Sequence, residues 1–118
     1  MNKKHIDKLI PKAMQNLNIL VKGGTIDKVY QGYLASFGAT VIQSGLLQTV
    51  MFYSADKNKN EVIKIMYELI KEDLKATQPT MKEFLLTNDN YKNYAIKNKI
   101  LEVNIACKLS IRTFELKE

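Results

Sequence analysis

The chain has little of the chemistry from which most active sites are built. Its 118 residues include one histidine, one cysteine and no tryptophan, and only one of its 18 basic residues is an arginine. The single cysteine, Cys107, excludes a disulfide framework and fits a reducing compartment. The first residues become amphipathic at once, without an apolar signal core. We therefore expect a cytoplasmic protein.

No catalytic motif is found in the sequence. The patterns H-E-x-x-H and C-x-x-C, the phosphate-binding P-loop and the nucleophile elbow are all missing. His5 and Asp7 are two residues apart and do not share a helix face, which argues against a metal pair. His5 also lies beside an N-terminus that we expect to be frayed, and Cys107 lies among apolar residues, where a free cysteine usually serves packing. We expect no enzyme, and neither cofactor, metal nor small-molecule substrate.

Apolar residues recur at steps of three and four along nearly the whole chain, which predicts an all-α protein. We expect a compact single-domain bundle, residues 1–118, of about five helices, with the long second and last helices central. The expected helices cover residues 4–21, 27–54, 62–74, a short segment opened by the Thr80–Glu83 capping box, and 91–114. Pro11 either kinks the first helix or begins its main part, and Gly23-Gly24 ends it.

One stretch of 27 residues, 29–55, carries no charge, although 25% of the chain is charged. It is long enough to span a membrane, but its Gln, Ser, Thr and Gly residues argue against that reading, and we expect no membrane. Rows of small residues instead allow close approach of a neighbouring helix, a partner subunit or a ribose-phosphate chain. Gly38 and Gly45, seven residues apart, are expected on one face. The candidate contact residues are Gly32, Ser36, Gly38, Thr40, Gln43, Ser44 and Gly45.

The formal net charge of +6 favours acidic partners, of which nucleic acid is the commonest. Because lysine acts as a point charge toward phosphates, the chain should bind a backbone without reading bases. Acidic and basic residues alternate at i,i+3 spacing within 56–78, which indicates a solvated face. Two other basic clusters, on the first and last helices, either follow a phosphate backbone or are solvated in the same way. The candidate phosphate contacts are Lys8, Lys12, Lys99, Lys108 and Arg112.

The run from Tyr30 to Tyr53 resembles the signature of the small helical subunit of the type III-B CRISPR effector, the Cmr RNA-silencing complex. The most specific part is S-F-G-A-T-V-I-Q-S-G-L-L, residues 36–47. The opening I-D-K-L-I-P-K-A-M, residues 6–14, is also similar to that family. One departure is Gln48, where many members have proline. The likeness covers most of the first half of the chain, and the helical second half is compatible with it.

This resemblance implies a non-catalytic subunit of an antiviral ribonucleoprotein. Copies of it would stack along the complex, contact the other Cmr subunits and line the groove that holds guide RNA paired with target RNA. Such duplexes are gripped through backbone and shape. One alternative is a pure protein-interaction module without direct RNA contact, such as the small subunit of a related type III-A effector. A further alternative is a DNA-binding regulator, although the single arginine and the lack of a helix-turn-helix argue against it.

Overall fold

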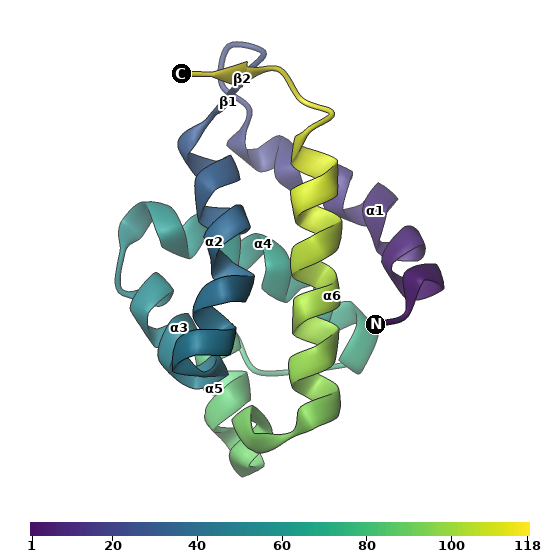
Figure 1. The fold of residues 1–118 in the computed structure, drawn as a ribbon, viewed down its shortest axis with the longest axis vertical. Coiled ribbons are helices and arrows are strands. Elements are labelled where there is room, and N and C mark those ends of the chain that lie inside the picture. Colours follow the sequence, from purple (N-terminus) through teal and green to yellow (C-terminus); the bar gives the residue numbers. More distant parts are fainter.

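The computed structural model describes residues 1–118, and nearly all of its regular structure is helical (Figure 1). Six α-helices and two 3₁₀ segments follow one another along the chain. They are α1 Lys3–Leu17, η1 Asn18–Leu20, α2 Val29–Ser44, α3 Leu46–Ser54, α4 Lys57–Leu74, α5 Met81–Leu86, η2 Thr87–Lys92 and α6 Tyr94–Ile111. The expected helical class is confirmed, with one α-helix more than the five predicted.

The all-α prediction needs one correction, because two short strands are present. The strands β1 Ile26–Asp27 and β2 Leu116–Lys117 pair in parallel, with Ile26 opposite Leu116. Gly23 and Gly24 take positive φ angles of 60° and 84° in the turn that leads to β1, and Ile26 is fully buried. Strands of two residues show no period-two alternation, so the sequence pattern could not reveal them.

The uncharged segment is two helices, because the chain breaks at Gly45. This residue has φ 95° and ψ 157°, a conformation that is essentially restricted to glycine. The single helix predicted over residues 27–54 is therefore wrong, and so is the shared face of Gly38 and Gly45. Apolar periodicity continues across the break, and a glycine in the sequence does not disclose its backbone angles. The break lies three residues before Gln48.

The most central helix is α4, which packs against α1, α2, α3, α5 and α6. Seven of its 18 residues are buried. The expected central place of the last helix is confirmed, since α6 packs on α1, α2 and α4 and buries eight residues. The second helix is not central as predicted. Only Leu34, Phe37 and Val41 of α2 are buried, so α2 is a surface helix that lacks charge.

Several local predictions are confirmed. The Thr80 hydroxyl accepts from the Glu83 N–H at 3.2 Å, as a capping box requires. Asn88 and Asp89 have φ angles of 50° and 55° in the expected turn, a conformation that these two residue types tolerate. Pro11 lies inside α1, and the helix continues through it.

Candidate nucleic-acid interface

The candidate interface is the surface that α2 and α6 share, called here the α2–α6 face. The two helices run side by side in Figure 1. They are joined near their middles, where the Asn104 side-chain amide donates to the Leu34 carbonyl at 3.1 Å. A Cβ added at Gly38 would lie 3.4 Å from the Asn104 Oδ1 atom. Gly38 therefore serves close packing of α2 on α6 within the chain, one of the interpretations that the sequence left open.

Two of the predicted phosphate contacts lie beside small residues of α2. Lys108 and Arg112 are one turn apart on α6, and neither forms an ion pair. They line a shallow hollow of 270 Å³ together with Lys28, Gln31, Gly32 and Ala35. Lys28 is paired with Glu118 at 2.6 Å. Lys108 and Arg112, both unpaired, therefore lie beside uncharged residues of α2. No carboxylate of α2 would repel a phosphate at this position.

Lys97 belongs to the same face and was missed by the sequence analysis. It lies 11 residues before Lys108, which is about three helical turns, so both project from the same side of α6 about 16 Å apart. Lys97 forms no ion pair in the structure. With Arg112 it defines a row of three unpaired cations about 22 Å long. The i, i+11, i+15 spacing of these three residues in the sequence could have indicated that they share one side of the helix.

The remaining predicted phosphate contacts lie elsewhere. Lys8 and Lys12 are on α1, which packs on the other side of α6 from α2 (Figure 1). The Lys12 ammonium is 2.5 Å from the Glu72 carboxylate of α4. The Lys99 ammonium is 3.2 Å from Asp73 and only partly exposed. The structure thus brings Lys108 and Arg112 together and leaves the other three candidates outside the α2–α6 face.

Lys99 is part of a partly buried polar cluster that ties the start of α1 to α4 and α6, so the expected frayed N-terminus is wrong. The His5 imidazole contacts Glu102 of α6 through Nδ1 and lies 3.4 Å from Asp73 of α4 through Nε2. The Asn2 N–H donates to the same Glu102 at 3.2 Å. Burial acts to raise the pKa of Asp73, but Lys99 and His5 hold it below its ordinary value. His5 and Asn2 lower the pKa of Glu102 against the same effect of burial.

One comparison with known proteins gives a match. Residues 7–110 match the family described as CRISPR-associated protein (Cas_Cmr5). The chain belongs to this family. It is therefore a CRISPR-associated Cmr5 subunit of a type III-B effector, and membership implies association with other Cmr subunits. No curated protein and no solved structure gives a significant match.

In this Cmr5-family chain the exposed side of α2 is neutral and built of small or short polar residues. Ser36 and Thr40 donate to the carbonyls of the residues four positions earlier, at 2.7 and 2.9 Å, so their hydroxyls are already satisfied. Gly38 and Thr40 are half-buried, and Gly45 forms the break before α3. The predicted contact residues that lie exposed are Gly32, Ser36, Gln43 and Ser44. Of these, Gly32 lines the hollow beside Lys108 and Arg112, and the other three belong to the outer surface of α2.

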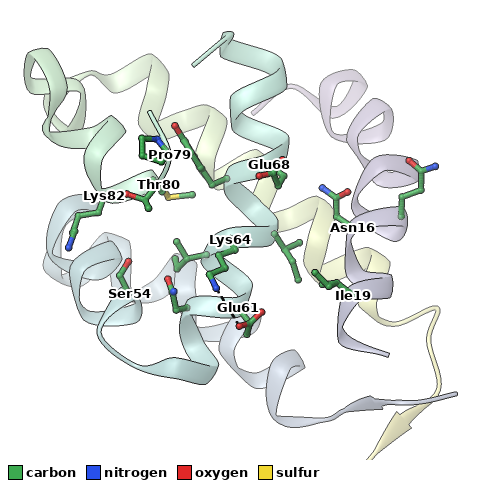
Figure 2. A pocket seen from close by; sticks show the side chains of 15 residues that line it. Asn16, Ile19, Ser54, Glu61, Lys64, Glu68, Pro79, Thr80 and Lys82 are labelled. Atoms are coloured by element: carbon green, nitrogen blue, oxygen red, sulfur yellow. Dashed lines mark ion pairs between the residues drawn. The ribbon is translucent and has the colours of Figure 1, made fainter. Parts of the chain in front are cut away.

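A larger hollow of this Cmr5-family chain lies on another part of the surface (Figure 2). It measures 730 Å³ and is enclosed by the end of α1, by η1, by one side of α4 and by residues 79–82. Its charged groups include Glu61 and Lys64, which pair with each other at 3.7 Å. The Tyr67 hydroxyl donates to the Gln78 carbonyl at 2.6 Å, and burial raises its pKa.

Three structural features bear on other classes of function. No group of three His, Cys, Asp or Glu side chains is placed to hold a metal ion. No helix combines the length and apolar character that crossing a membrane would require. Burial raises the pKa of the Cys107 thiol to about 12, so the lone cysteine is a buried packing residue in this fold.

Proposed function

We propose that this Cmr5 subunit is non-catalytic and helps to hold guide RNA paired with target RNA against its α2–α6 face. The observation that supports the proposal is the row of Lys97, Lys108 and Arg112. All three lack a carboxylate partner, whereas six of the chain's other lysines form ion pairs. Unpaired cations in a row bind a phosphate backbone without distinguishing bases. In an RNA-guided effector the base pairing itself supplies the sequence specificity.

Six lysines of the chain are already paired with a carboxylate. They are Lys12, Lys28, Lys64, Lys71, Lys92 and Lys99. Pairing removes most of the attraction of a lysine for phosphate, because the carboxylate partner repels the phosphate. The three residues of the row keep their full positive charge.

The neutral side of α2 complements this row. It carries no acidic group that would repel a backbone, and its small residues allow a ribose-phosphate chain to approach closely. An A-form duplex presents its phosphates and 2′-hydroxyls rather than readable base edges in the deep groove, which suits such a surface. In this proposal α2 allows the RNA backbone to approach closely, and α6 supplies the positive charge that binds the phosphates.

Salt dependence of RNA binding tests the proposal. A reconstituted Cmr effector that carries Lys97→Gln, Lys108→Gln and Arg112→Gln in this subunit is titrated with duplex RNA at several salt concentrations. Each lost phosphate contact lowers the slope of log K against log salt by about 0.7 to 0.9, so the triple variant should lose about 2 to 3. The matched control changes Lys3, Lys22 and Lys75 to Gln, which removes the same charge elsewhere. Equal slopes in the two variants would exclude the α2–α6 face as the RNA contact.

A second candidate function is a protein-interaction module without RNA contact. The observation that favours it is the hollow of Figure 2, whose rim carries Ile19 with 72% of its surface exposed. Stacking of copies, or docking of another Cmr subunit, would use such a concave surface. If Ile19→Asp abolishes incorporation into the complex while the cation variants change nothing, this function replaces the first.

A further inference from the structure

A second cationic feature lies at the opposite edge of α2 from the Lys97–Arg112 row. Lys59, in the first turn of α4, places its ammonium 4.5 Å from the centre of the Phe52 ring. The same nitrogen is 5.6 Å from the centre of the Tyr53 ring and 5.8 Å from that of Tyr33. Lys59 forms no ion pair, and the nearby Asp56 carboxylate caps α4 through Oδ1, which accepts from the N–H groups of Asn58 and Lys59. The ammonium therefore keeps its charge for an outside anion.

Phe52 is the ring of this cluster that faces solvent, with 62% of the residue exposed. Its neighbour Tyr53 is buried, packs edge-on against Phe37 and donates its hydroxyl to the Tyr33 carbonyl at 2.8 Å. The Phe52 and Tyr53 rings form an edge-to-face contact, with 6.4 Å between the ring centres. The Lys59 ammonium lies over one face of the Phe52 ring, so a base would stack on the other face. An exposed aromatic ring with an anchored neighbour and a nearby cation has the composition of a nucleobase-stacking platform.

The cluster is continuous with the α2–α6 face through α2 itself. Tyr33, which contacts Lys59, directly follows Gly32, which lines the hollow beside Lys108 and Arg112. Consecutive residues of a helix point about 100° apart, so the two cationic features flank the neutral side of α2. An RNA backbone that crosses α2 between them would meet positive charge at both edges.

We propose that Phe52 and Lys59 form a second RNA contact, in which the Phe52 ring stacks on an unpaired nucleobase and Lys59 binds the adjoining phosphate. The proposal rests on the proposed function only in its choice of RNA as ligand. A protein partner fits less well, because an apolar surface that covered Phe52 would also bury the unpaired ammonium of Lys59. A nucleotide satisfies both groups at once.

The absence of tryptophan provides a direct test. Phe52→Trp introduces a single indole into the chain, at the proposed platform. This variant is titrated with an end-labelled oligouridylate and with an abasic oligoribonucleotide of equal length, while oligonucleotide anisotropy and tryptophan emission are recorded together. Both oligonucleotides should bind through their phosphates, but only the oligouridylate should quench the emission. Quenching by neither, or equal quenching by both, would overturn the proposal.

Loss-of-ring variants separate this site from the α2–α6 face. Phe52→Leu should weaken oligouridylate binding about 5- to 150-fold, the range typical of one stacked base, and Phe52→Tyr should bind like the parent chain. Lys59→Gln should also weaken binding, through the loss of one phosphate contact. Duplex RNA binding should change less than twofold in these variants, whereas the Lys97, Lys108 and Arg112 variant should behave in the opposite way. Circular dichroism checks that the variants are folded. If Phe52→Leu leaves RNA binding intact and instead blocks assembly with other Cmr subunits, the patch is a protein contact and the proposal fails.

Discussion

Replacing His5 with alanine should destabilise this subunit far more than its position near the N-terminus suggests. The imidazole lies between two carboxylates, and the Glu102 side chain is only 7% exposed. Leaving a buried polar group without one of its hydrogen-bond partners costs about 1 to 3 kcal/mol, and more for a charged group such as the Glu102 carboxylate. Glu102 keeps the Asn2 N–H at 3.2 Å and Asp73 keeps Lys99 at 3.2 Å, so we expect a loss of about 3 kcal/mol.

Lys12 provides the matched control on the same helix. Its pair with Glu72 is solvent-exposed, with 49% and 62% of the two side chains accessible. Exposed pairs contribute about 0.2 to 1 kcal/mol, so Lys12→Ala should cost less than a third of the His5→Ala effect. The measurement is the free energy of unfolding from guanidinium titrations of both variants and the parent chain. Equal losses in the two variants would refute the view that the cluster fastens α1.

The same cluster predicts how stability responds to acid. The pKa values of Asp73 and Glu102 lie below their ordinary 3.8 and 4.5 in the folded chain. Groups with a lowered folded-state pKa contribute stability above the unfolded-state pKa and lose it as the pH falls through the folded value. The parent chain should therefore lose stability as the pH falls below about 4.5, and the His5→Ala variant should lose less over that interval. Unfolding titrations between neutral and acidic pH measure both slopes.

Three further outcomes follow from single residues. Gly45→Ala should destabilise by about 1 to 3 kcal/mol in thermal melts, because its backbone conformation is strained for any other residue although no atom lies within 4 Å of the added Cβ. Gly32→Ala, also with free space but helical, should instead stabilise by about 0.5 to 1 kcal/mol, and a loss there would contradict the helical assignment. Cys107, whose pKa burial raises to about 12, should react with a thiol reagent only after the chain unfolds in denaturant, and fast labelling of the native chain would show that the core is open.

Local patterns in the sequence carried the prediction of helices and of caps. The capping box at Thr80, the turn at Asn88 and the helical class depend on residues within a few positions of one another, and the structure confirms them. The Gly45 break was missed because its signal is a backbone angle, which a glycine permits without requiring. Residue spacing alone therefore merged two helices into one.

Long-range contacts explain the other differences. His5 and Glu102 are 97 residues apart, and nothing in the local sequence around His5 indicates its partner. The placement of α2 was wrong because absence of charge usually indicates burial, whereas α2 exposes its small neutral residues. Among the basic residues, Lys97 and Lys99 are two positions apart, yet α6 directs Lys99 to Asp73. Which of them stays unpaired depends on α4, a helix more than 20 positions away in the chain.

The neutral exposed side of α2 has a practical consequence for handling complexes that contain this subunit. Ionic strength weakens contacts between charges and leaves contacts between uncharged, closely packed surfaces largely unaffected. A protein neighbour held by Gly32, Ser36 and the adjoining residues would therefore remain attached in a high-salt wash, while RNA held by Lys97, Lys108 and Arg112 would elute. Stepwise salt elution of an immobilised Cmr complex thus separates what binds the helix α2 from what binds the cations beside it.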